Sequence, residues 1–157
     1  MNNSKTKEAH DMHLNIEISR TISLAYSAVC KPLCKDLNLP QTAFDILMFL
    51  GNNPKYKTAS SIVEVRHIKA NLVSVNVERL VQQGYLIRQP IQGDRRKTEL
   101  ICTQKAQPII SRGKQLQHSF FEKMLSNMDD NTKQVFLSAL SIIENNLKAI
   151  LEAEERQ

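Results

Sequence analysis

A strand, a basic turn and a second strand, placed after two short helical segments, constrain the fold of this chain most. Residues 85–91 (YLIRQPI) form an extended, β-prone run. Residues 92–97 (QGDRRK) read as a turn rich in positive charge, and residues 98–103 (TELICT) alternate apolar and polar side chains. Two extended runs around such a turn predict a β-hairpin.

The two helices that precede the hairpin carry their own end signals. Thr58 is a candidate N-cap for a short helix that runs through Val65. The next helix is expected over residues 69–83, and Gly84 is the residue type that often follows a helix end. Its core-facing stripe comprises Val73, Val77, Leu80 and Val81. Two short helices followed by a basic-tipped hairpin are the architecture of a winged helix-turn-helix.

Longer helical patterns flank this region. Residues 14–33 repeat apolar side chains at spacings of three and four, and residues 44–51 are apolar on most sides, which predicts a buried helix. Thr103 is a candidate cap for the helix after the hairpin, and Asp129 for the last helix. That last helix carries a heptad seam of Phe136, Leu140, Ile143, Leu147 and Ile150.

The positive charge of the chain is concentrated in the second short helix and the hairpin. The whole sequence has 157 residues and a formal net charge of +5. Residues 66–105 hold eight basic residues against three acidic ones, an excess of five. A localised positive field of this kind favours a polyanionic partner, and double-stranded DNA fits the fold.

These patterns predict a mainly α fold with a small β-hairpin wing. Residues 37–103 are expected to form the winged helix-turn-helix DNA-binding domain. Residues 1–36 and 104–157 are expected to form a helical dimerisation region, because the apolar stripes at both chain ends exceed what one small domain needs. The expected assembly is therefore a homodimer.

The polar face of the helix over residues 69–83 is the first candidate DNA contact. Opposite its core stripe lie Lys69, Asn71, Ser74, Val75, Asn76 and Arg79. The major groove admits one α-helix, whose first turns reach base edges. Either asparagine could bind adenine through two hydrogen bonds, the serine a base or a phosphate, and the valine a thymine methyl. The lysine and the arginine are suited to phosphates.

The predicted wing is the second candidate contact. Arg95, Arg96 and Lys97 lie at its tip, where three neighbouring like charges repel one another unless a polyanion neutralises them. A wing arginine inserted in a narrow, A·T-rich minor groove gains from the negative potential there. Asp94 is expected to orient Arg96, through a salt bridge or by capping the turn.

Residues 58–106 resemble the core of MarR-type transcriptional regulators, and with its flanking helices the likeness covers nearly the whole chain. It rests on an ordered set of motifs at matching spacing: Val73-Ser74, Val77, Arg79-Leu80, Gly84, Asp94-Arg95-Arg96, Leu100 and Thr103-Gln104-Lys105. The resemblance implies a homodimer that binds a pseudo-palindromic operator, usually as a repressor, and is released by a small ligand or by thiol oxidation. An effector pocket is expected near the first, second and fifth helices.

The chain departs from the family pattern at three places. Arg66-His67 stands in the helix-turn-helix turn, where the family often has glycine. Ala106 replaces a second frequent glycine, and Val75 occupies a recognition-helix position that is often polar or basic in relatives. These departures leave the fold intact and bear on the operator sequence.

Two alternative functions remain open at this point. Cys30 and Cys34 lie one helical turn apart, so oxidation of a thiol could reshape the dimer, although two small buried side chains are the simpler reading. A winged helix can also serve as a protein-interaction module without an operator. Such a module would not need Arg95 and Arg96 at its tip.

Enzyme, cofactor and membrane functions find no support in the sequence. The chain lacks the common motifs for nucleophilic serine, phosphate-loop, zinc-protease and dinucleotide chemistry. No cofactor and no metal are expected. The N-terminal residues have no apolar signal core, no apolar run is long enough to span a bilayer, and three cysteines suit free thiols, so a cytoplasmic protein is expected.

Overall fold

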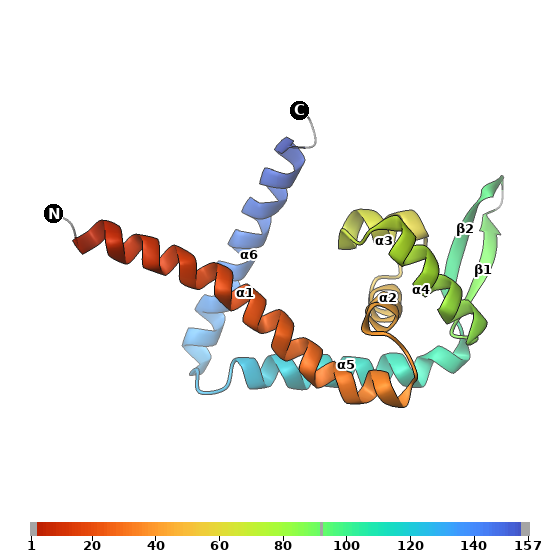
Figure 1. Ribbon diagram of the computed structural model, residues 1–157, viewed down its shortest axis with the longest axis horizontal. Coiled ribbons are helices and arrows are strands. Elements are labelled where there is room, and N and C mark those ends of the chain that lie inside the picture. Colours follow the sequence, from red (N-terminus) through yellow and green to blue (C-terminus); the bar gives the residue numbers. More distant parts are fainter. Residues whose placement is uncertain (1–2, 92, 155–157) are drawn as a thin grey trace. The chain divides into compact units, whose positions relative to one another are not determined.

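The structure is a computed structural model that describes residues 3–91 and 93–154, with side chains described for residues 17–91, 93 and 98–154. The elements in chain order are α1 (Asn3–Asp36), α2 (Gln41–Asn52), α3 (Ala59–Arg66), α4 (Ala70–Gln82), β1 (Leu86–Ile91), β2 (Asp94–Cys102), the 3₁₀ turn η1 (Gln104–Ala106), α5 (Gln107–Met124) and α6 (Asp130–Glu154) (Figure 1). The predicted fold class, mainly α with a β-hairpin wing, is confirmed. No helix within the described ranges is long and apolar enough to cross a membrane.

The chain forms two compact units. The first comprises Met1–Phe120 and holds α1 to α4, the hairpin and most of α5. The second comprises Phe121–Gln157 and holds the end of α5 and α6. The predicted grouping of residues 1–36 with 104–157 in a dimerisation region stays a prediction.

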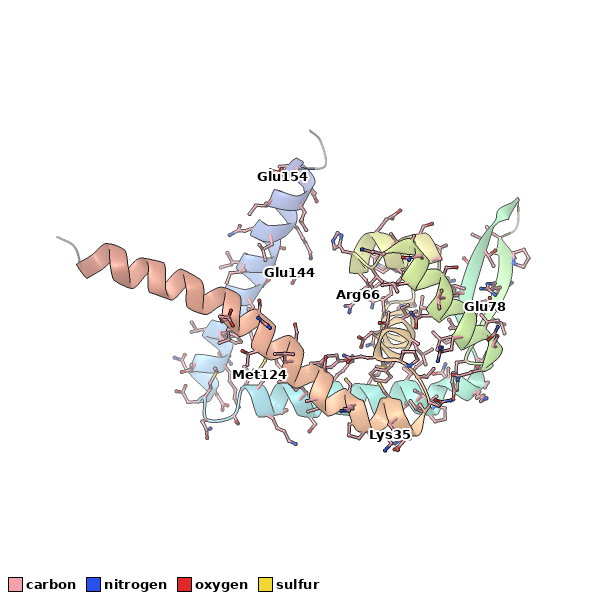
Figure 2. All side chains as sticks on the ribbon, viewed as in Figure 1. Lys35, Arg66, Glu78, Met124, Glu144 and Glu154 are labelled. Atoms are coloured by element: carbon pink, nitrogen blue, oxygen red, sulfur yellow. The ribbon has the colours of Figure 1, made fainter. Side chains whose placement is uncertain are left out.

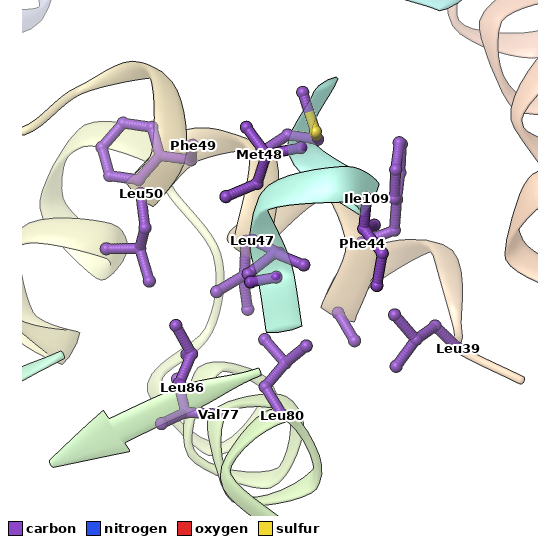
Figure 3. Close-up of a cluster of buried hydrophobic side chains, with 14 of the residues drawn as sticks. Leu39, Phe44, Leu47, Met48, Phe49, Leu50, Val77, Leu80, Leu86 and Ile109 are labelled. Carbon is purple, nitrogen blue, oxygen red and sulfur yellow. The ribbon is translucent and has the colours of Figure 1, made fainter. Parts of the chain in front are cut away.

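Helix α2 is the centre of the first unit because it is apolar on nearly every side. Phe44, Ile46 and Leu47 are almost completely buried. Figure 3 shows Leu47 surrounded by side chains from α4, β1 and α5, among them Leu80, Leu86 and Ile109. This burial of aliphatic and aromatic side chains holds the helix-turn-helix, the wing, the end of α1 and the start of α5 to one core.

Helix α5 packs very closely on α2, and Gly113 permits it. A Cβ atom at Gly113 would collide with Met48 Sδ and would lie 2.9 Å from Met48 Cε and 3.1 Å from Phe44 Cζ. The sequence places Gly113 on the apolar stripe of its helix, and the structure shows that the missing side chain is what the packing requires.

Three of the predicted helix-end residues are confirmed. Thr58 Oγ1 accepts a hydrogen bond from the Ser61 amide at 3.1 Å, so it is the N-cap of α3. Asp129 Oδ1 accepts from the Thr132 amide at 2.9 Å before α6. Gly84 follows α4 with a φ of 75°, and the next amide, of Tyr85, donates back to Leu80 O at 2.8 Å.

The prediction that Thr103 caps the next helix is wrong. Its side chain makes no cap hydrogen bond to η1. The Thr103 hydroxyl instead donates to Gly84 O at 2.7 Å, and the Thr103 amide donates to Tyr85 O at 3.0 Å. The residue therefore ties the end of the hairpin to the end of α4, because the antiparallel pairing of β1 with β2 brings these two chain segments together.

The hairpin is confirmed, but its turn is shorter than predicted. Strands β1 and β2 pair antiparallel from Leu86↔Cys102 to Pro90↔Thr98, and β2 already begins at Asp94. The register shifts at Pro90/Ile91, where Ile91 pairs with Asp94, so residues 95–97 have no partner in β1. Pro90 lacks an amide hydrogen for the ladder, which accounts for an irregularity at this position.

The link between α3 and α4 contains a residue in the left-handed conformation. His67 has a φ of 50°, a backbone state that costs a residue with a Cβ atom about 1 kcal/mol. We therefore expect His67→Gly to raise the free energy of unfolding by about 0.5–1 kcal/mol in urea titrations. Gly84→Ala, at a φ of 75°, is the matched control and should shift it in the opposite direction. Destabilisation by His67→Gly would contradict this account.

Candidate nucleic-acid interface

Helix α4 separates a buried face from an exposed one. Val73, Val77 and Leu80 are buried in the core, as the stripe predicts. The exposed face presents Asn71, Ser74, Val75 and Arg79, and Lys69 is exposed at the N-terminal end of the helix. Five of the six candidate base- or phosphate-contacting side chains are thus accessible together from one side of α4.

Asn76 departs from the prediction. Its side chain is only 6% exposed, and its Nδ2 donates to Leu72 O at 2.8 Å. Asn76 lies beside Val73 and Val77 on the helix surface, and these two stripe residues are one helical turn apart. The face of α4 that packs on the core therefore includes Asn76. The expected two-point contact with adenine is left to Asn71.

The exposed face is also more apolar than expected. Val75 is 61% exposed and Leu72, which the helical pattern assigned to neither face, is 47% exposed. The Asn71 side chain accepts a hydrogen bond from the Leu72 amide at 2.9 Å through Oδ1. Two exposed apolar side chains beside Asn71 suit contact with thymine methyl groups in a major groove.

Glu78 of α4 forms an ion pair with the first strand of the wing. Arg88 of β1 donates to Glu78 Oε2 at 2.8 Å, and Gln82 donates to Glu78 Oε1 at 3.2 Å (Glu78 is labelled in Figure 2). The pairing neutralises the one carboxylate of α4 and joins helix to strand. No local pattern in the sequence predicts this pair, because the two residues are ten positions apart and meet only once the hairpin forms.

The base of the wing has further anchors. The Leu100 amide of β2 donates to Lys57 O at 2.6 Å, so the segment before α3 borders the hairpin. Lys57 Nζ also lies 3.8 Å from Glu99 Oε2. In η1, which follows β2, Lys105 Nζ donates a hydrogen bond to Gln83 O after α4 at 2.7 Å. These contacts fix the hairpin on the helix-turn-helix.

The tip of the wing holds the remaining predicted contacts. The backbone of Asp94, Arg95, Arg96 and Lys97 belongs to β2. Their side chains lie outside the described residues, so the predicted orientation of Arg96 by Asp94 stays a prediction.

A polar pocket of about 230 Å³ lies within the first unit, beside the helix-turn-helix. Its lining comes from α1, α2 with the residue that follows it, α3 and α5: Tyr26, Asp45, Met48, Phe49, Asn52, Asn53, Arg66 and Gln117. Gln117 Nε2 donates to the Tyr26 hydroxyl at 2.9 Å, and Asn52 Nδ2 donates to Gln117 Oε1 at 3.4 Å. The hydrogen-bonded side chains connect α5 to α1 and α2, which are far from it in sequence.

Asp45 is half-buried in this pocket, and its protonation is perturbed. Burial raises the pKa of the Asp45 carboxyl, against the opposing effects of the Arg66 charge and of hydrogen bonding to Tyr26 and Gln41. Burial likewise raises the pKa of Tyr26. A desolvated carboxyl in a concave site is a candidate for ligand recognition.

The raised pKa of Asp45 predicts how stability depends on pH. The folded carboxyl holds its proton more tightly than the unfolded one, so this group lowers stability as pH rises above its ordinary pKa of about 4. We expect Asp45→Asn to raise the melting temperature near pH 7 and the gain to vanish below about pH 4. Asp36→Asn, at an exposed position of α1, is the control. A loss of stability at pH 7 would count against this reading.

The cysteines of α1 are buried and poorly disposed to ionise. Burial raises the pKa of Cys30, and burial together with the nearby Cys30 and Asp45 raises the pKa of Cys34 to about 11. Because the thiolate is the reactive form, native Cys34 should alkylate with iodoacetamide about a hundredfold more slowly than a thiol of ordinary pKa. Peptide mass spectrometry of native and urea-unfolded chain measures the ratio. Equal rates in both states would restore the thiol-sensing hypothesis.

Comparison with known proteins agrees with the geometry. Residues 37–97 match the model of the MarR family. A MarR transcriptional regulator from Methanosarcina mazei Go1 is 23% identical, with a TM-score of 0.70 over 84% of this chain and 97% of that one. A MarR protein from Peptoclostridium difficile is 19% identical, with a TM-score of 0.76 over 85% and 87%. No curated protein matches the chain.

One similar structure includes nucleic acid. A MarR family transcriptional regulator from Listeria monocytogenes complexed with 26-mer DNA is 17% identical, with a TM-score of 0.75 over 84% of this chain and 87% of that one. At these identities the structures establish the fold, and with the family match they confirm the resemblance inferred from the sequence.

Proposed function

We propose that this MarR-type chain is a transcriptional repressor that binds a pseudo-palindromic operator as a homodimer in the cytoplasm. The exposed face of α4 carries the proposal: Asn71, Ser74 and Arg79 are accessible beside Val75, while the opposite face is buried. A helix so presented, next to a hairpin anchored at its base, suits a major groove and the adjoining minor groove. A similar fold occurs in a complex with 26-mer DNA, which supports DNA binding.

The homodimer is supported by α6. Its heptad seam is uncovered in the single chain: Ile143, Leu147 and Ile150 are each at least half exposed. Apolar side chains in a continuous seam of this length are rarely left in water and mark an interaction surface. Pairing of α6 with a second copy of the chain would give the assembly two winged helix-turn-helix domains, one for each half-site of the operator.

Release by a small ligand is supported by the pocket that Asp45, Tyr26 and Gln117 line, since it reaches Arg66 at the end of α3. The thiol-sensing alternative is disfavoured, because Cys30 and Cys34 are buried and their pKa values are raised.

Selection of binding sites from a random duplex library tests the proposal. The full chain should enrich an inverted repeat whose half-sites lie about one helical turn apart, and light scattering should find two chains per duplex. Replacing Asn71 by Ala should relax the base preference at one position per half-site, whereas Asn145→Ala on α6 should not. A library without an enriched motif would contradict the operator and favour a protein-interaction module.

A further inference from the structure

Asp45 is the one acid among the residues that line the α1–α2–α3–α5 pocket. It stands on α2, the central helix of the core, and is half-buried there. A carboxylate placed inside an apolar core costs free energy unless a partner compensates for the lost water. The one basic residue in the lining is Arg66 (labelled in Figure 2), whose side chain is exposed.

Three amide side chains of the pocket donate hydrogen bonds within the protein. Asn53 Nδ2 donates to Phe49 O at 2.9 Å, Asn52 Nδ2 to Gln117 Oε1, and Gln117 Nε2 to the Tyr26 hydroxyl. The Asp45 carboxylate, which also has hydrogen bonds to Tyr26 and Gln41, and the amide oxygens of Asn52 and Asn53 provide acceptors. A half-buried carboxylate with amide oxygens beside it is matched by a ligand that carries hydrogen-bond donors.

The size and the apolar wall narrow the ligand further. The volume of about 230 Å³ is below the range of roughly 300–1,000 Å³ that drug-sized ligands occupy, so the ligand is compact. Met48 and Phe49 supply the apolar part of the lining. Asp45 is half-buried whereas Arg66 is exposed, so the less hydrated charge of the pocket is the carboxylate, which pairs with a cationic ligand and repels an anionic one.

We propose that this pocket binds a small organic cation, a primary ammonium on a compact aromatic or aliphatic group, with the ammonium at Asp45 and the apolar group against Met48 and Phe49. The ammonium competes with the Arg66 charge for the Asp45 carboxylate. The proposal names the class of ligand that the effector site of the proposed function binds. Its predicted effect on DNA binding rests on that proposed function.

The position of Arg66 gives the ligand a route to the DNA-binding surface. Arg66 is the last residue of α3, and His67 in the left-handed conformation follows it before α4 begins at Ala70. When the ligand weakens the electrostatic attraction between Asp45 of α2 and Arg66 of α3, the turn between α3 and α4 is less firmly fixed relative to α2. A ligand changes DNA affinity only through different affinities for the two arrangements, and competition for Asp45 supplies such a difference.

Calorimetry on the full chain without DNA tests the binding step. The probe is 2-phenylethylamine at pH 7, compared with the neutral 2-phenylethanol and the anionic phenylacetate. The amine should bind at least tenfold more tightly than the alcohol, and phenylacetate more weakly still. Asp45→Asn should reduce amine affinity at least tenfold with little change for the alcohol, and Asp36→Asn, outside the pocket, should change neither. Tighter binding of phenylacetate, no amine binding at 10 mM, or an unchanged Asp45→Asn variant would overturn the proposal.

Fluorescence anisotropy with a labelled duplex tests the regulatory step. Saturating amine should weaken DNA binding at least fivefold in the wild type and by less than twofold in Asp45→Asn. Amine binding without any effect on DNA affinity would overturn the Arg66 route. A chain that binds amine but no DNA would instead remove the proposed function and leave the ligand class standing.

Discussion

Replacing Arg95 and Arg96 together by alanine is expected to weaken DNA binding about ten- to hundredfold near physiological salt and to flatten its salt dependence. Each phosphate contact that is lost lowers the slope of log K against log salt by about 0.9. Two arginines on each of two wings account for a decrease of about 2 to 4 in that slope. Anisotropy titrations on a fixed duplex between 50 and 200 mM KCl measure both quantities.

The control for the wing variant removes the same charge elsewhere. Lys31 and Lys35 are exposed near the C-terminal end of α1, and their double replacement by alanine should change affinity by less than twofold. Circular dichroism melting should show both double variants folded. If the wing variant keeps the wild-type affinity and slope, the wing does not dock on DNA, and a protein-interaction module becomes the better reading.

Charges placed in the seam of α6 have the second large effect. Ile143→Glu with Leu147→Glu puts two carboxylates where both side chains are at least half exposed in the single chain and, in the proposed dimer, buried. An unpaired buried charge costs several kcal/mol, so the chain should sediment as a monomer. DNA affinity should fall about a hundredfold or more, because the second half-site no longer binds at high effective concentration.

The polar face of the same helix provides the control for the seam. Ser138 and Asn145 are exposed and lie on the side of α6 away from the seam. Ser138→Glu with Asn145→Glu adds the same charge and should leave both the sedimentation coefficient and the DNA affinity unchanged. A seam variant that remains dimeric would refute the predicted role of residues 104–157 in dimerisation.

Local signals in the sequence are sufficient for most of the fold. Thr58 and Asp129 cap their helices through side chains three residues from their partners, and Gly84 ends α4 through its own backbone. The stripe of Val73, Val77 and Leu80 has the helical period, and burial follows it. Interactions within one turn or one period are visible in a linear chain.

What the sequence could not predict depends on contacts between distant segments. Asn76 looks like its polar neighbours until the packing of α4 on α2 determines which side is buried. Thr103 has the residue type of a cap, but the hairpin brings Gly84 O within reach of its hydroxyl. Tyr26 and Gln117, 91 positions apart, meet only after three helices have assembled, so no local pattern announces the pocket.

The pairing of Arg88 with Glu78 also bears on how operators can vary. Thr103 and Lys105, which follow β2, also donate hydrogen bonds to the backbone just after α4. The hairpin and α4 are therefore joined at several points and should move as one body. The distance along DNA between the bases read in the major groove and those read in the minor groove is then the same in every site. In the proposed complex, inserting or deleting a base pair within a half-site should therefore abolish binding, because α4 and the wing cannot change their separation to follow the bases.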